Sequence, residues 1–391
     1  MTVRAGTGQW PEQGWRIVLY GTLGTKADTA AAEAGAGVRM AMLEVYWDRF
    51  EPRQNVVNQA YAAEVKAAQR AYQDAGMSVT LGLDMASPPS WVFGLADSHY
   101  INQYGQRAGE PAFVFSNSVR EAAADFMARV AGVVPFGGFL AARITSGGNG
   151  EMLYPDNGLW AFSSPALTGR NLPAGMTANP FPGWRPGHTG ITGAQVDQWV
   201  DWYVGGLVNV TRWAMNTCDS LGFRGYFMPV TPGSGTRPSD LAASAARYLT
   251  GDDTTAVGAV WHRYYAKLPN KSRVIAYVSS VADGSGNDDR TLAADVSVPL
   301  SSPDMDGWSA TRWITRIAHE YQLAGIAGEN PGYGASRELD ERYVDTSADG
   351  MMATALRQAK ASGFTAFYWA HDVRLWDGTV PFAAYATMIN S

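Results

Sequence analysis

Eight apolar runs, most of them followed by a stretch with helical periodicity, are the feature of this sequence that most constrains its fold. A chain that alternates strand and helix with short joints is typical of a parallel sheet, because parallel strands need a crossover between them. Eight such strands predict a closed (β/α)8 TIM barrel. The predicted strands are residues 15–21, 38–47, 78–84, 139–144, 222–230, 273–278, 321–328 and 364–372.

Three long insertions interrupt this alternation, at about 152–193, 231–255 and 281–307. In a barrel, long loops after the C-terminal ends of the strands usually carry the functional site. Neither a linker nor an internal repeat divides the chain. We therefore expect residues 1–391 to form a single catalytic domain with enlarged loops on the C-terminal face of the strands.

The charge and the apolar pattern argue against two classes of partner. A formal net charge of −6 disfavours nucleic acid, since phosphate binding requires clustered Lys and Arg. No run approaches the roughly 18 apolar residues of a membrane span. Residues 1–13 lack the apolar segment of a signal peptide, and Cys218 has no second cysteine with which to pair. The compartment stays open, either cytoplasmic or secreted.

Aromatic side chains are abundant, with 14 Trp and 18 Tyr among 391 residues, and many lie beside Gly, Pro and Asn. Aromatic rings on loops stack on the flat faces of sugar rings, and neighbouring polar groups bind the hydroxyls. This pattern favours an oligosaccharide or polysaccharide substrate. The alternative for each ring is burial in the core.

Two glutamates follow two of the predicted strands. Glu151 comes after strand 139–144 and a glycine-rich turn, and Glu329 directly follows strand 321–328. The C-terminal ends of all barrel strands meet at one face, where two carboxyl groups can cleave a glycosidic bond. We predict Glu151 as the acid/base and Glu329 as the nucleophile, with Arg39 and Tyr277 as hydrogen-bond donors to Glu329.

Further polar residues lie near strand ends. Asp84 and Asp372 are suited to bind sugar hydroxyls, and His371 is placed to line the site. Glu44 and Glu51 are other acids near strand ends, and Glu51 suits a structural role better. The histidines are scattered, and the sequence has no glycine-rich phosphate loop, so neither a metal nor a cofactor is predicted.

Several motifs resemble a known group of enzymes. Arg39, the segment Trp47 to Pro52 and the turn Pro88-Pro89-Ser90-Trp91 are similar to the second and third strands of clan A glycoside hydrolases, most closely the family 42 β-galactosidases. The resemblance implies an acid/base in the Asn149–Glu151 segment, and Glu329 as the nucleophile. The expected substrate-binding residues are Arg39, Trp47, Asp84, Trp91, Asn149, Tyr154, Tyr277, Trp369, His371 and Asp372.

The resemblance further implies a retaining mechanism on β-galactosidase-like substrates, through a covalent glycosyl-enzyme. One departure is Gly150, which separates Asn149 from Glu151, whereas in the clan the two residues are adjacent. The segment from Gly150 to Pro155 also looks like the acid motif of the β-amylases, which invert. An inverting β-amylase-like hydrolase and a carbohydrate-binding barrel without catalysis are therefore the alternatives.

Overall fold

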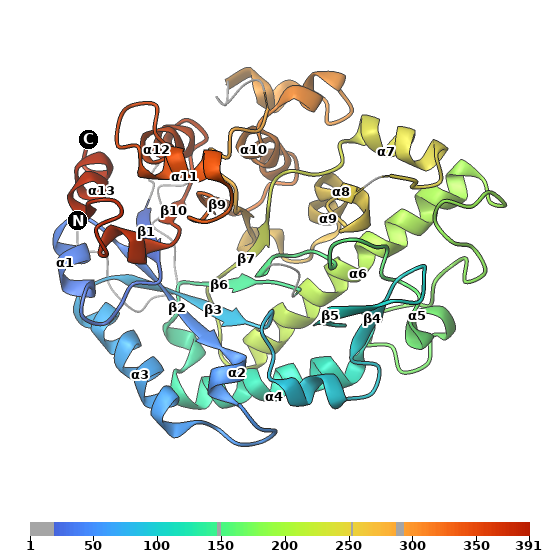
Figure 1. The fold of residues 1–391 in the computed structure, drawn as a ribbon, viewed down its shortest axis with the longest axis horizontal. Helices are drawn as coiled ribbons and strands as arrows, with labels where there is room; N and C mark the ends of the chain where they lie inside the picture. The colour runs from blue at the N-terminus through green and yellow to red at the C-terminus, as the bar shows by residue number, and fades with distance from the viewer. Residues whose placement is uncertain (1–18, 147–149, 252, 287–292) are drawn as a thin grey trace.

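The computed structural model describes residues 19–146, 150–251, 253–286 and 293–391. They form a closed barrel of eight parallel strands with helices around it, which confirms the predicted fold class (Figure 1). The strands follow one another around the barrel in the order β1-β10-β9-β8-β7-β6-β3-β2. The strand bounds are β1 Leu19–Leu23, β2 Met40–Tyr46, β3 Ser78–Asp84, β6 Ala141–Ile144, β7 Tyr226–Thr231, β8 Ile275–Val278, β9 Gly325–Glu329 and β10 Ala366–Trp369.

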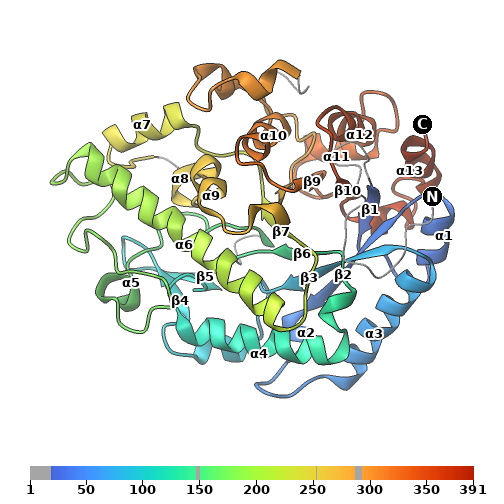
Figure 2. The ribbon, with the colours of Figure 1, turned by 180° about the vertical axis from the view of Figure 1, so that it is seen from behind.

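Helices lie between successive strands and cover the outside of the barrel, as the two opposite views show (Figures 1 and 2). The longest, α6, begins with a capping box in which Thr192 and Gln195 each bond the other's backbone amide. None of the described helices is long and apolar enough to cross a membrane. The helix bounds are α1 Ala30–Gly35, α2 Trp47–Phe50, α3 Gln59–Asp74, α4 Asn117–Val133, α5 Ser164–Thr168, α6 Gly193–Ser220, α7 Pro238–Ala246, α8 Asp253–Ala256, α9 Trp261–Lys267, α10 Ala310–Glu320, α11 Arg337–Val344, α12 Met351–Ala361 and α13 Phe382–Ile389.

The segment after β6 is long and packs against the barrel's helical layer. Its Trp160 and Trp184 are each only 5% exposed. The indole of Trp184 meets that of Trp199 on α6 edge to face, with ring centroids 5.7 Å apart. Next to it, the residues after β3 form an antiparallel hairpin of β4, His99–Ile101, and β5, Arg107–Pro111. The aromatic residues of this region therefore stabilise the fold.

Side chains alternate between the two faces of each barrel strand. The inward positions near the N-terminal ends are apolar and form a small inner core, which includes Met40, Ile275 and Tyr368. The outward positions, among them Val45, Ile326 and Trp369, pack against the helices in a much larger core. This alternation decides which side chains at the strand ends can reach the barrel mouth.

Trp369 lies on the outward face of β10, which corrects the expectation that it binds sugar. Its side chain is 0% exposed. Its ring contacts Tyr343 of α11, at a centroid distance of 4.7 Å, and Tyr385 of α13, at 6.0 Å. The neighbouring Tyr368 takes the inward face instead. Trp369 is thus a core residue.

We predict that Trp369→Ala lowers the free energy of unfolding by about 3–5 kcal/mol, because it removes a fully buried ring. Guanidinium denaturation followed by circular dichroism measures the loss. The matched control is Trp376→Ala, since Trp376 is 40% exposed and should cost much less. Similar losses for the two variants would contradict the assignment of Trp369 to the core.

Candidate active site

Glu329 ends β9 and faces the inside of the barrel, where two strands supply hydrogen-bond donors to it. The hydroxyl of Tyr277 on β8 donates to Glu329 Oε2 at 2.6 Å. The guanidinium of Arg143 on β6 donates to Glu329 Oε1 at 3.2 Å. Both carboxylate oxygens are therefore held, and an arginine partner favours a charged carboxylate.

Arg143 takes the role that the sequence suggested for Arg39. Arg39 precedes the first residue of β2, so it lies at the N-terminal end of the barrel, opposite the mouth. Its guanidinium donates to the backbone carbonyls of Ala34, at 2.7 Å, and Val38, at 3.2 Å. Arg39 is exposed and cannot reach Glu329, which corrects the prediction.

Glu151 follows β6 in a turn that the neighbouring strand anchors. The amide of Ser146 donates to the carbonyl of Glu151 at 2.9 Å, and the amide of Met152 donates to Val230 of β7 at 2.7 Å. The hydroxyl of Ser279, just after β8, donates to Glu151 Oε1. These contacts hold the carboxyl group at the C-terminal mouth of the barrel.

The Glu151 carboxyl group is largely desolvated and lies near the negative charge of Glu329. Its pKa is raised to about 7, mainly by burial and further by the negative charge of Glu329. The hydrogen bond from Ser279 and the charge of Arg143 oppose this rise. A glutamic acid with such a pKa keeps a proton near neutral pH, as a general acid must.

Two cavities meet at the mouth. The larger, which we call the main hollow, has a volume of about 510 Å³ and includes Glu44, Arg143, Ser279, Glu329 and Asp372 in its lining. The smaller, the side hollow, has a volume of about 180 Å³. Its lining residues are Glu44, Gly82, Leu83, Asp84, Arg143, Thr145 and Gly150. Glu44 and Arg143 thus line both cavities and join them.

Three of the expected substrate-binding residues line these hollows. Asp84 lies in the side hollow, and His371 and Asp372 lie in the main hollow. His371 Nδ1 is 3.0 Å from the carbonyl oxygen of Tyr333. Asp372 is only 3% exposed. Burial, followed by the nearby Glu33, raises the pKa of Asp372 to about 8. Asn149 lies outside the described residues.

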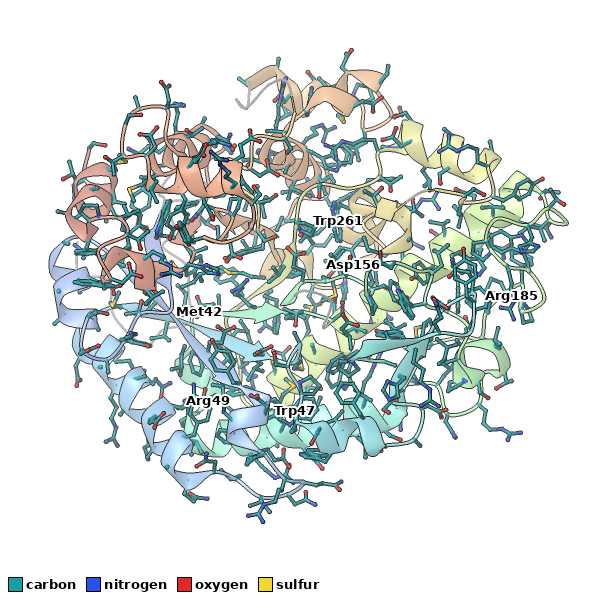
Figure 3. All side chains as sticks on the ribbon, in the orientation of Figure 1. Met42, Trp47, Arg49, Asp156, Arg185 and Trp261 are labelled. Carbon is teal, nitrogen blue, oxygen red and sulfur yellow. The ribbon has the colours of Figure 1, made fainter. Side chains whose placement is uncertain are left out.

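Three other aromatic residues expected to bind sugar lie elsewhere. Trp47 is 0% exposed and stacks on Phe126 of α4. Trp47 is the first residue of α2, and Figure 3 shows it apart from Met42, which lines the main hollow. Tyr154 is also buried, and its ring stacks on Tyr203 at a centroid distance of 3.9 Å.

The third, Trp91, is half-buried, donates its indole N–H to the carbonyl oxygen of Glu51 at 3.1 Å, and lines neither hollow. It meets Trp47 edge to face, with ring centroids 5.9 Å apart. Trp47 and Tyr154 are buried in the apolar core, which corrects the expectation that they bind sugar. The expectation for Trp91 stays a prediction.

The structure adds Arg143, Thr145 and Ser279 to the site, and it brings in Glu44, which the sequence marked only as an acid near a strand end. Strict alternation along the strand containing Ala141 and Arg143 would have placed Arg143 inside the barrel. Within the described residues, no group of three or more His, Cys, Asp or Glu side chains is placed to hold a metal ion.

Comparison with known proteins supports the fold. No protein-family model and no curated protein sequence matches the chain. The catalytic domain of β-amylase from Paenibacillus polymyxa is 13% identical, with a TM-score of 0.63, over 96% of this chain and 98% of that one. A β-galactosidase from the psychrophilic Marinomonas ef1 is 12% identical, with a TM-score of 0.53, over 90% of this chain and 53% of that one. At such identities the likeness is one of fold, the (β/α)8 barrel.

We predict that Ser279→Ala raises the pKa of Glu151 beyond its value of about 7, because the variant loses a hydrogen bond to the charged carboxylate. Carbon-13 NMR of glutamate-labelled protein can follow the titration, with Glu151→Gln identifying the resonance. Ser280→Ala is the control, since Ser280 donates to the carbonyl oxygen of Pro232. An unchanged or lower pKa in Ser279→Ala would refute the contact.

Proposed function

We propose that this protein is a glycoside hydrolase that uses Glu151 and Glu329 as its two catalytic carboxyl groups. The observation that carries the proposal is the contrast between their environments at one barrel mouth. Burial and the charge of Glu329 raise the pKa of Glu151 to about 7, whereas Arg143 and Tyr277 hold both oxygens of Glu329. Glycosidic bond cleavage requires such a pair, one carboxyl group protonated and the other charged.

The proposed reaction is a double displacement. Glu151 donates its proton to the glycosidic oxygen while Glu329 attacks the anomeric carbon, and the leaving group departs as an alcohol. The charged Glu151 then removes a proton from a water molecule, which attacks the anomeric carbon and releases Glu329. Two inversions at the same carbon give a product that keeps the anomeric configuration of the substrate.

Arg143 supports a nucleophilic role for Glu329. A general base must accept a proton from water, and a close arginine opposes that step by favouring the charged carboxylate. A nucleophile benefits from the same partner, since it must stay charged and oriented until it attacks. By resemblance of the segments around Trp47 and Trp91, β-galactosides are the first substrate class to examine.

Inversion is the second candidate mechanism. The segment from Gly150 to Pro155 resembles the acid motif of the β-amylases, and the chain matches a β-amylase catalytic domain over nearly the whole length of both. In an inverting enzyme Glu329 would activate water directly, with the carboxyl groups about 6.5–9.5 Å apart instead of about 5–5.5 Å. Both mechanisms use Glu151 as the acid. A barrel that binds sugars without cleaving them is the remaining alternative.

We predict that Glu151→Ala reduces kcat/KM by about 10²–10⁴-fold for glycosides with poor leaving groups, and far less for dinitrophenyl glycosides. Good leaving groups do not need the proton that Glu151 supplies. Sodium azide should rescue turnover of the dinitrophenyl substrates. The control is Glu338→Ala, an exposed glutamate in the first turn of α11, which should leave activity unchanged. Equal loss on all substrates would exclude an acid role for Glu151.

We predict that the first-formed sugar has the same anomeric configuration as the substrate. A panel of nitrophenyl glycosides identifies a cleaved substrate, and proton NMR in the first minutes of the reaction reports the anomer before mutarotation. An inverted product would assign Glu329 as a general base. The absence of turnover across the panel, together with measurable sugar binding, would instead favour the carbohydrate-binding barrel.

A further inference from the structure

The side hollow contains polar groups that the two-carboxylate mechanism does not use. Thr145 is 8% exposed, and its hydroxyl has no hydrogen-bond partner among the described residues. Arg143 Nε is likewise buried and unpartnered there. Both residues line the side hollow. A buried polar atom without a hydrogen-bond partner costs free energy. Such atoms in a cavity therefore indicate a bound group that forms the missing hydrogen bonds.

Two carboxylates face the same space. Glu44 lies on β2 and Asp84 on β3, and these strands pair in parallel, with Glu44 opposite Gly82 and Tyr46 opposite Asp84. Asp84 Oδ1 accepts hydrogen bonds from the amides of Ala86, at 3.0 Å, and Ser87, at 3.2 Å, which fixes its orientation. The two acids therefore present acceptors opposite the donors of Arg143 and Thr145.

We infer that the side hollow recognises adjacent hydroxyl groups of an uncharged sugar ring, through Glu44, Asp84, Thr145 and Arg143. The inference rests on the proposed function, since it places the sugar next to the catalytic pair. A hydroxyl group both donates and accepts, so one hydroxyl can donate to a carboxylate while its oxygen accepts from Arg143 Nε. A ligand that only accepts would leave the carboxylates facing its lone pairs.

Charge narrows the ligand to neutral sugars. Glu44 and Asp84 would repel the carboxylate of a uronic acid or a sulfate ester, and desolvation in a small cavity strengthens that repulsion. Arg143 already pairs with Glu329, so its charge is largely compensated. The side hollow thus selects against anionic glycosides.

The position of the side hollow connects recognition to cleavage. Glu44 and Arg143 line both hollows, and Gly150, the residue before Glu151, lines the side hollow. A sugar whose anomeric carbon lies near Glu329 in the main hollow can therefore direct hydroxyl groups past Arg143 into the side hollow. The ring that is recognised is the one whose glycosidic bond is cleaved.

The test compares three variants on two substrates. The substrates are the nitrophenyl glycoside that the protein cleaves best and the matching nitrophenyl uronide, which differs by a carboxylate. Thr145→Val removes one hydroxyl group with little change of shape, and Asp84→Asn removes one negative charge. Thr315→Val is the control, because Thr315 is buried in α10, where its hydroxyl donates to the carbonyl oxygen of Thr311 at 2.7 Å.

Wild-type protein should cleave the neutral glycoside at least about 100-fold more efficiently than the uronide. Thr145→Val should raise KM for the neutral glycoside by about 3–10-fold, the loss expected for one hydrogen bond, with a smaller effect on kcat. Asp84→Asn should weaken binding of the neutral glycoside. It should also reduce the ratio of kcat/KM for the neutral glycoside to kcat/KM for the uronide by about 10-fold. Thr315→Val should match wild type.

The outcomes separate this inference from the proposed function. If the protein cleaves glycosides, an unchanged KM in Thr145→Val would overturn the inference, and so would comparable cleavage of the uronide by the wild-type protein. Either result would leave the proposed hydrolase function standing. If no glycoside is cleaved, saturation-transfer NMR with free neutral hexoses and hexuronates replaces kinetics. If hexoses bind, hexuronates do not, and Thr145→Val weakens hexose binding, the result would support sugar recognition in the side hollow without catalysis. Equal binding of hexoses and hexuronates would refute it.

Discussion

The ion pair between Arg143 and Glu329 inside the barrel is the interaction on which the rest of the site depends. Their side chains are only 13% and 12% exposed, and the closest nitrogen and oxygen atoms are 3.2 Å apart. Either charge alone would be costly to bury at this depth, so removing one partner would destabilise the other. Despite its burial, Arg143 has a raised pKa because Glu329, Tyr277 and Glu44 surround it.

This ion pair lets several acids share one small space. Glu44 and Glu329 are within electrostatic reach of Arg143, and so is Glu151. Without a cation at the centre, mutual repulsion would shift more than one of these carboxyl groups to the protonated form. Arg143 donates a hydrogen bond to Glu329, whereas burial is the main cause that raises the pKa of Glu151 to about 7. The two carboxyl groups therefore have the different environments that the proposed chemistry requires.

The apolar core and the proposed site occupy different layers of the barrel. The outward faces of the strands and the surrounding helices supply most of the apolar core, and large rings such as those of Trp47, Trp199 and Trp369 belong to it. The inward faces change from apolar at the N-terminal end to polar at the mouth. Substitutions in one layer should therefore affect the other only weakly.

The sequence predicted the architecture because strand and helix alternate along it, and β3 coincides with its predicted bounds. Glu329 could be located because a buried run ends at it. Arg39 was misassigned because it lies at the N-terminal end of its strand, far from the mouth. Trp369 was misassigned because its side chain points to the outward face of its strand. Motif resemblance shows neither the end of the strand nor the face. Thr145 could not be anticipated, since its lack of a partner emerges only when β6 meets its neighbours.

The most direct test of this account is a crystal structure of Glu151→Gln soaked with a glycoside that the wild-type protein cleaves. The account predicts an intact sugar in the main hollow, with its anomeric carbon beside Glu329, the substituted side chain at the glycosidic oxygen, and ring hydroxyls in the side hollow near Arg143. A sugar bound away from Arg143 and Glu329, with only water in both hollows, would contradict the account.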